Sequence, residues 1–334
     1  MNSTPFSGPS TRRELLRTGT AFLGAGVVAS IAPRNLFAYP QPPLGNAQQA
    51  AATDPLAQMR AQMATIPLET LKLRDNLFML HGPGGNMVVL NGSDGKVLVD
   101  SSFSSVAPKL RQSMDALGNA PLKVLINTHW HIDHTDGNQA MHEAGAMILA
   151  HENTRKRMST PQTVAALGMR FDASPAAALP QQTFSDTFKL YFDGEELSLS
   201  YVPLAHTDTD IFVHYHQGNV LHMGDLWFNG TYPFIDASTG GNINGMIVGA
   251  TRGISVADTD TKIVPGHGPM GDKAALTKYR DMLTTVRDRV QTLKSSGKSL
   301  PDVIAAKPTA DLDDQWGKGF MKSEFFVTIV YQTL

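Results

Sequence analysis

Four side chains that can bind metal ions lie within six residues, at His129, His131, Asp133 and His134. They follow the apolar, strand-like run 124–126. In an extended segment, residues two apart point to the same side, so His129 and His131 can both offer an imidazole to one ion. Asp133 and His134 come where the chain turns toward the next predicted helix, within reach of a second ion. The spacing is typical of a two-metal hydrolytic site; the alternative is a polar loop with chance histidines.

Three further motifs carry potential ligands at the ends of predicted strands. His206 stands in Pro-Leu-Ala-His-Thr-Asp, Asp225 in His-Met-Gly-Asp, and His267 in the tight turn Pro-Gly-His-Gly-Pro. Loops at strand ends are where binding and catalytic residues collect, so these three side chains are candidates for the same site.

In this order, the motifs resemble those of the metallo-β-lactamase superfamily, from about Leu71 to Leu293. The resemblance implies an αββα sandwich with the site at the edges of the two sheets. It also implies a first metal bound by His129, His131 and His206, a second bound by Asp133, His134 and His267, and Asp225 bridging both.

The expected cofactors are two zinc ions, because imidazole suits zinc and hydrolysis needs no redox change. An all-His/Asp site also accepts iron or manganese. Bound zinc lowers the pKa of water from about 16 to about 7, so a metal-bound hydroxide can attack a carbonyl. The expected substrate is a small ester, thioester, lactone or amide, with Asp133 as the catalytic residue that orients the hydroxide.

Three alternatives stay open from the sequence. One is a β-lactamase, although one lactamase group has a metal-binding cysteine where Asp225 stands and a lysine three residues later, where this chain has Phe228. Another is an iron-dependent redox enzyme of the same fold. The third is a metal-binding module without turnover, disfavoured because buried His/Asp clusters are costly unless occupied.

Six other residues are predicted to surround the metals. Asn86, Trp227, Asn229 and Tyr232 are expected to contact substrate, and Asp100 and His222 to support the ligands from behind. The hairpin 82–86 is either a substrate flap or a plain turn. His214 and His216 are expected to be structural or solvated.

Composition narrows the class of protein. The chain has 334 residues, 42% of them hydrophobic and 17% charged, with a formal net charge of -2. This is ordinary globular composition without a basic stripe, so we expect a small-molecule substrate and no nucleic acid. Cysteine is absent, which excludes disulfides and a cysteine nucleophile.

Residues 1–38 resemble a twin-arginine export signal, because Arg12 and Arg13 precede the apolar stretch 18–32. An N-terminal membrane anchor is the alternative, but the stretch is shorter than the roughly 20 residues of a span. We therefore expect the export machinery as a partner of the precursor, a periplasmic or secreted location, and no stable membrane insertion of the mature form.

The remaining chain divides into a linker at 39–66, a hydrolase domain at 67–298 and a C-terminal extension at 299–334. The extension is expected to dock on the domain because 325–331 is too apolar to be free. Strands followed by a helix, in two halves, predict an α/β architecture with two mixed sheets packed face to face and flanked by helices, a four-layer αββα sandwich. Helices are expected at Pro108–Leu117, Gly137–Ala144, Ile243–Ile254 and Asp272–Lys294. A short helix is also expected in the linker near Pro55–Ala64, and a helix with an irregular excursion at 152–186.

Overall fold

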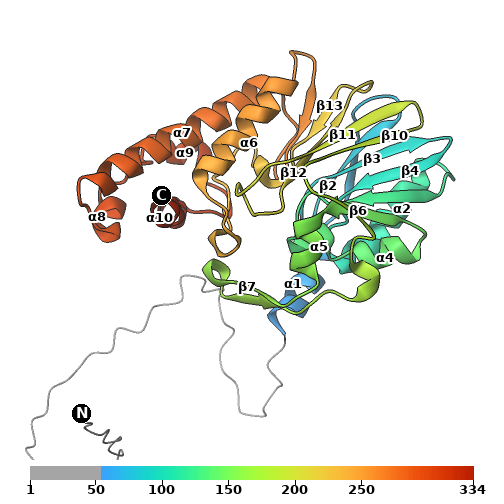
Figure 1. Cartoon of the computed structure of the whole chain (residues 1–334), viewed down its shortest axis with the longest axis horizontal. Coiled ribbons are helices and arrows are strands. Elements are labelled where there is room, and N and C mark those ends of the chain that lie inside the picture. The colour runs from blue at the N-terminus through green and yellow to red at the C-terminus, as the bar shows by residue number, and fades with distance from the viewer. Residues whose placement is uncertain (1–53) are drawn as a thin grey trace, which may run out of the picture. The chain divides into compact units, whose positions relative to one another are not determined.

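The computed structural model describes residues 54–334 (Figure 1). The predicted signal at 1–38 and most of the predicted linker lie outside these residues. The described part of the linker contains a helix, α1 (Pro55–Met63), as the sequence suggested near Pro55. Within 54–334, no helix is both long and apolar enough to cross a membrane.

Two β-sheets form the centre of the fold. The seven-stranded sheet contains, in spatial order, β1 (Glu69–Lys72), β2 (Leu77–His81), β3 (Met87–Gly92), β4 (Gly95–Val99), β5 (Leu122–Ile126), β6 (Met147–His151) and β9 (Gln182–Phe184). The five-stranded sheet contains β10 (Thr187–Phe192), β11 (Glu195–Tyr201), β12 (Ile211–Tyr215), β13 (Val220–His222) and β14 (Lys262–Val264). Each sheet begins antiparallel and becomes parallel, from β4 onward in the first and between β13 and β14 in the second.

Helices cover the outer faces of both sheets (Figure 1). On the first sheet lie α2 (Ala107–Ala116) and α4 (Asn138–Glu143), and on the second lie α6 (Ile243–Val256) and α7 (Lys273–Ser295). Short helices are α3 (Ile132–Thr135), α5 (Glu152–Met158), α8 (Leu300–Ala305) and α9 (Asp313–Trp316). The predicted αββα sandwich is confirmed, and α2, α4, α6 and α7 begin and end within two residues of the helices expected from the sequence.

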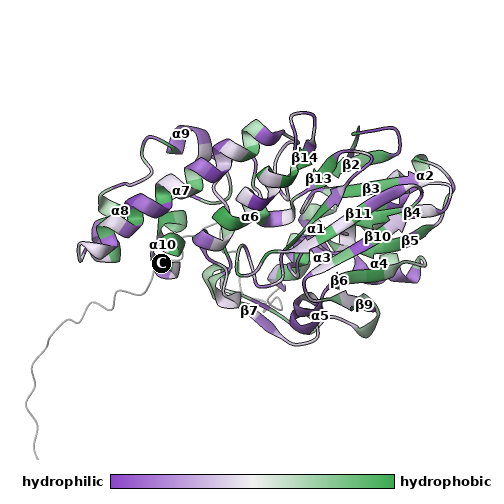
Figure 2. Ribbon diagram, turned by 45° about the horizontal axis from the view of Figure 1, so that its top comes forward, coloured by the Kyte–Doolittle hydropathy of each residue, from purple (hydrophilic) through white to green (hydrophobic). Residues whose placement is uncertain are grey.

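Alternating side chains explain why the layers stack. On β3, Val88 and Leu90 belong to the core between the sheets, whereas Met87 and Val89 face the helices. Because strand residues alternate between faces, a strand that is apolar at every position must be covered on both sides. In Figure 2 the strands are mostly hydrophobic, and α7 is hydrophobic on one side and hydrophilic on the other.

The C-terminal residues pack onto the second sheet's helical layer. Helix α10 (Ser323–Thr333) contacts α7 and α8, and Phe326 is fully buried in the same core as α6 and α7. The ring of Phe326 stacks on Tyr232 at 4.7 Å between centroids. The extension is therefore part of the folded domain.

One region differs from the sequence-based expectation. Residues 152–186 were expected to hold a helix and an irregular excursion, but after α5 they form a hairpin of β7 (Gln162–Val164) and β8 (Met169–Phe171), followed by β9. These strands are three residues long, too short to show an alternating pattern in the sequence.

Candidate metal centre

The first metal-binding motif occupies the loop between β5 and α3. His131 is the residue before α3 and is extended, with φ -60° and ψ 149°, so the chain turns into the helix at Ile132. His129 and His131 therefore lie in the loop, and Asp133 and His134 lie in the single turn of α3. This is the placement that the motif spacing predicted.

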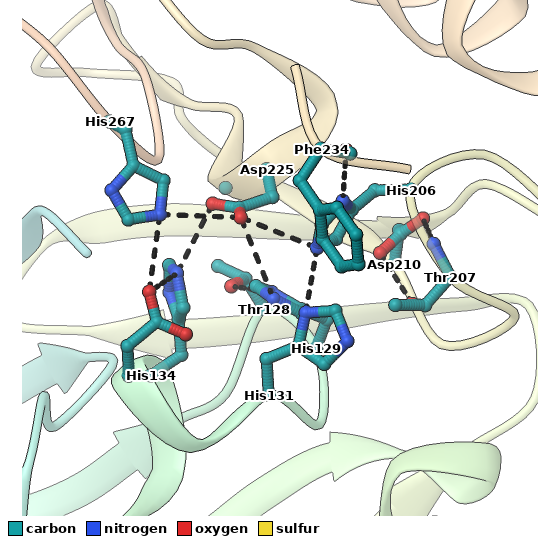
Figure 3. Close-up of polar contacts among 12 residues, drawn as sticks. Thr128, His129, His131, His134, His206, Thr207, Asp210, Asp225, Phe234 and His267 are labelled. Carbon is teal, nitrogen blue, oxygen red and sulfur yellow. Dashed lines mark hydrogen bonds and ion pairs between the residues drawn. The ribbon is translucent and has the colours of Figure 1, made fainter. Parts of the chain in front are cut away.

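The structure brings all seven predicted ligands into one cluster. Figure 3 shows His129, His131, His134, His206, Asp225 and His267 pointing toward one another. Three groups have ligand atoms within 4.8 Å of one another: His129, His131 and His206; His129, His134 and Asp225; and Asp133, His134 and His267. The first and third groups share no residue, so the cluster offers two separate ion positions.

Asp225 lies between the two positions. One oxygen is 3.1 Å from His134 Nε2, and the other is 3.3 Å from the Nε2 atoms of both His206 and His267. His267 Nε2 is also 3.2 Å from Asp133 Oδ2. A carboxylate reached from both groups is placed to bridge two ions.

In several of the ligand histidines, one ring nitrogen is engaged in a hydrogen bond, which leaves the other ring nitrogen available to bind a metal. His206 Nδ1 donates to the carbonyl of Phe234 at 2.8 Å, and His134 Nδ1 donates to Asp100 at 2.8 Å. Asp100 also accepts from the backbone and hydroxyl of Thr128. Such partners fix the ring orientation and the tautomer that leaves the other nitrogen available to a metal. The structure thus places Asp100 in the supporting position expected for it.

Asp236 supports His131 in the same way, and it was missed in the sequence. Its carboxylate is 3.1 Å from His131 Nε2, which leaves Nδ1 facing the cluster, 2.8 Å from His206 Nε2. Its backbone N–H donates to the carbonyl of His206. Asp236 is 1% exposed and lies in a segment without regular structure, so no periodic pattern marks it.

Unpaired buried atoms show that the cluster fits metal ions. Among the described residues, His129 Nε2, His134 Nε2 and Asp225 Oδ1 are buried without a hydrogen-bond partner. Such atoms are costly unless something binds them. Four carboxylates (Asp100, Asp133, Asp225 and Asp236) surround the imidazoles. Their four negative charges equal the positive charge of two divalent cations, and imidazole with carboxylate is a donor set that suits zinc, iron or manganese.

The electrostatics of the cluster also favour cations. Burial and the imidazole of His134 hold the pKa of His129 well below its ordinary value. Burial opposes protonation of His267 too, but the carboxylates of Asp225 and Asp133 outweigh it and raise the pKa of His267 to about 10. The carboxylates that hold a proton on His267 also attract metal cations, and metal binding at His267 would release that proton.

Two glycines let the loops approach the ligands. A Cβ at Gly85 would collide with the ring of His134, and a Cβ at Gly266 would collide with the carboxylate of Asp225. Gly85 N–H donates to the carbonyl of Asp133. The hairpin 82–86 is therefore held against the metal-binding loops, which favours the plain turn among the two expectations for it.

Asn86 and His222 support the backbone of this region. Asn86 is 2% exposed, and its amide donates to the carbonyls of Pro265 and Gly268, on either side of His267. The prediction that Asn86 contacts substrate is therefore wrong. His222 bonds to the carbonyl of Asn86 and accepts from Gly224 N–H, so it contacts no ligand side chain by a hydrogen bond.

A pocket of about 450 Å³ opens over the cluster. Of the other predicted substrate contacts, Tyr232 lines it, although its hydroxyl donates to Asp313. Trp227 is fully buried in the core, and the Asn229 amide donates to the carbonyl of Pro269; neither lines the pocket. For these two residues the prediction is wrong, because adjacency to Asp225 in sequence does not place a side chain in the pocket. The structure instead places Phe228 there.

Comparison with known proteins agrees with this geometry. The family model of the metallo-beta-lactamase superfamily matches residues 82–289. A metallo-beta-lactamase type 2 from Bacillus sp. (strain 170) is 28% identical over 199 residues, covering 59% of this chain and 72% of the relative.

Solved structures share the fold. A metallo-beta-lactamase from Pontibacter korlensis has a TM-score of 0.54 and 20% identity, covering 65% of this chain and 99% of the other. The sec-alkylsulfatase Pisa1 from Pseudomonas sp. has a TM-score of 0.62 and 16% identity, covering 79% of this chain and 50% of the other. With its His/Asp metal site assembled in the loops of this fold, the chain belongs to the metallo-beta-lactamase superfamily and is a metal-dependent hydrolase.

Proposed function

We propose that the protein is a dinuclear zinc hydrolase that cleaves a small ester, thioester, lactone or amide. The observation that carries this proposal is the pair of ligand groups without a shared residue, bridged by Asp225 and lying at the floor of the pocket. When bound there, zinc ions acidify water and polarise a carbonyl oxygen.

The chain's own residues position the reacting groups. Asp133 lines the pocket, and its side chain is 25% exposed, whereas that of Asp225 is 4% exposed. Burial opposes ionisation of Asp133, but the imidazoles of His134 and His267 outweigh it and hold the pKa of Asp133 well below its ordinary value. Asp133 is thus the most exposed carboxylate of the cluster and, being ionised, can orient a water molecule by accepting a hydrogen bond from it. The imidazoles of His131 and His267, also in the lining, are held by Asp236 and by the two cluster carboxylates, respectively.

The test is a substrate panel applied to protein loaded with zinc. Esters, lactones, thioesters including S-lactoylglutathione, and the β-lactam nitrocefin are incubated with the protein, and hydrolysis is followed by absorbance with and without EDTA. Hydrolysis of at least one carbonyl substrate, abolished by EDTA and restored by zinc, supports the proposal. Absence of hydrolysis across the panel, with two zinc ions bound per chain, would refute it.

β-Lactam hydrolysis is a second candidate, favoured by the 28% identity to the Bacillus metallo-beta-lactamase. Nitrocefin turnover decides it. A secondary alkyl sulfate belongs in the panel too, because the sec-alkylsulfatase Pisa1 shares the fold over 79% of this chain. Metal analysis of protein purified without added metal separates zinc from iron and so tests the redox alternative.

We also propose export through the twin-arginine route, supported by Arg12 and Arg13 before the apolar stretch 18–32. The precursor would then meet the export machinery, and the mature protein would be periplasmic or secreted. Cell fractionation tests this: replacing both arginines with lysine should retain the protein in the cytoplasm, and unchanged export would contradict the proposal.

A further inference from the structure

The pocket over the metal cluster has a polar floor and apolar walls. The floor consists of metal-cluster residues, among them His131, Asp133 and His267. Its volume of about 450 Å³ lies within the range of roughly 300–1,000 Å³ that is usual for small-molecule sites. The walls therefore decide which small molecules can reach the floor.

Three segments far apart in the sequence contribute the outer walls: α1, the β7–β8 hairpin, and the residues just before α10. Their pocket-lining side chains include Met59, Met63, Leu167, Met169, Phe320 and Met321. All six are apolar. Independent segments that each direct Met, Leu or Phe toward one cavity indicate that the cavity receives an apolar group.

Helix α1 is held in place as a wall. The guanidinium of Arg60 forms an ion pair with Asp136 through two hydrogen bonds of 2.5 and 2.8 Å. The ammonium group of Lys109 donates to the carbonyls of Ala64 and Ile66 just after the helix. These contacts join α1 to the loop after α3 and to α2, so Met59 and Met63 face the pocket from a fixed position.

Charge is absent from the walls. Among the described residues that line the pocket, none is a lysine or an arginine, and the aspartates and histidines all belong to the metal cluster. On β8, Met169 lines the pocket, whereas Arg170 lines the neighbouring cleft with Arg60 and Arg157; Phe171 lies between the two and lines both. A substrate anion placed against these walls would lose its hydration without gaining a partner.

Four of the six side chains named above lie outside the protein's own core: Met59, Met63, Met169 and Phe320. Phe320 is 68% exposed, and Met169 belongs to none of the buried hydrophobic clusters or the residues packed against them. A large apolar side chain that lines a pocket without packing in the core is available to contact a ligand.

We propose that the substrate is an uncharged ester or lactone carrying a hydrocarbon chain, and that Met169 and Phe320 set the preference for that chain. The inference rests on the proposed hydrolase function and names its substrate class. The carbonyl lies at the metal cluster, and the chain lies between the β7–β8 hairpin, α1 and the segment before α10.

The test is a series of p-nitrophenyl esters from acetate to decanoate, used below their critical micelle concentrations with the zinc-loaded full chain. Burial of each methylene is expected to raise kcat/KM about threefold to fourfold until the pocket is filled. Esters of the same length that end in a carboxylate should be at least ten times poorer substrates. Alkyl-substituted lactones should follow the same order as the esters.

Matched variants of β8 locate the effect. Met169→Ser should flatten the dependence on chain length while metal content and melting temperature stay unchanged, and Phe320→Ser should do the same. Arg170→Ser, on the other side of the strand, should keep the wild-type dependence. Met169→Lys should improve the carboxylate-ended esters relative to the neutral ones.

The outcomes separate the inference from the function beneath it. Ester hydrolysis with equal efficiency for all chain lengths, or with preference for the carboxylate-ended series, overturns the inference and leaves the hydrolase standing. No hydrolysis of any ester or lactone by the zinc-loaded protein overturns the proposed function and the inference with it. Equal effects of Met169→Ser and Arg170→Ser would remove Met169 from the specificity determinants.

Discussion

Replacement of Asp236 by asparagine should weaken metal binding at the three-histidine group. In the native protein, one carboxylate oxygen accepts from His131 Nε2, and the other accepts from the backbone and hydroxyl of Ser238. Both oxygens are acceptors, and asparagine can supply only one.

Either orientation of the new amide is unfavourable. If its oxygen faces Ser238, its NH₂ group faces His131 Nε2, and that nitrogen must then accept a hydrogen bond. The ring proton of His131 moves to Nδ1, which is the atom that faces His206 and the cluster. A protonated Nδ1 cannot bind a metal. If its oxygen faces His131, the N–H and hydroxyl of Ser238 lose their part-buried acceptor and face the new NH₂ group instead.

The expected loss of zinc affinity can be estimated from other proteins in which a carboxylate is hydrogen-bonded to a metal-binding histidine. Changing a carboxylate behind a metal-binding histidine typically costs about 10–100-fold in metal affinity. This corresponds to roughly 1.4–2.7 kcal/mol at 1.36 kcal/mol per tenfold change. The effect should be confined to one of two ions, because no hydrogen bond or ion pair joins Asp236 to Asp133, His134 or His267.

The assay is a zinc titration of metal-free protein in competition with a chromogenic chelator, which gives an affinity for each ion. Ser238→Ala is the matched control, because it removes a neighbour of Asp236 but keeps the carboxylate and the tautomer of His131. Only Asp236→Asn should show a weakened site. Two zinc ions bound by Asp236→Asn as tightly as by the native protein would refute this account of His131.

Four further outcomes are expected. His131→Ala should lower the metal content and abolish turnover, measured by elemental analysis and substrate hydrolysis; unchanged activity would exclude His131 from the mechanism. Removal of zinc by EDTA should lower the melting temperature, since an ion at about 100 times its Kd stabilises the fold by about 2.7 kcal/mol, roughly 5–10 °C for a domain of this size. Phe326→Ala should reduce the free energy of unfolding by about 3–5 kcal/mol in urea, because its ring is fully buried; a loss under about 1 kcal/mol would mean that α10 docks without it. Burial and the neighbouring His216 lower the pKa of His214 from 6.5 to about 4. The contribution of neutral His214 to the free energy of unfolding is therefore fully present above pH 6.5 and is lost as the pH falls toward 4. His214→Gln should flatten that part of the urea-stability profile, by about 1 kcal/mol after solvent screening, and an unchanged profile would contradict it.

His129, His131, Asp133 and His134 could be predicted from the sequence because their geometry is local, whereas His206, Asp225 and His267 were assigned through the resemblance of their motifs to those of the family. His129 and His131 are two apart in an extended loop, and Asp133 and His134 follow within one turn of helix, so spacing alone fixes their directions. The sandwich could be predicted for a similar reason, since β3 is apolar at positions that alternate between two cores. In both cases a short stretch of chain carries the information.

Residues whose role depends on distant contacts could not be predicted in this way. Asp236 meets His131 across 105 positions of sequence, and Phe326 meets Tyr232 across a segment that includes α6 and α7. Trp227 was misplaced because it stands two residues after Asp225, yet its indole lies in the core with α6 and α7. Neither spacing nor composition indicates which of two neighbouring side chains faces the pocket.

The same distinction explains why the chemistry of this site is easier to read than its substrate. Backbone hydrogen bonds join the metal-binding loops directly: Asn86 N–H to Gly266, Asp236 N–H to His206, and Ser101 N–H to His134. The metal cluster is therefore fixed by loops at the ends of the two sheets. The specificity-determining walls come instead from α1, a hairpin of three-residue strands and the segment before α10, none of which belongs to either sheet. Residues in those walls can change without disturbing the metal ligands. A family resemblance that rests on the ligands therefore does not identify the substrate, which must be inferred from the walls. In this protein the walls are apolar and uncharged.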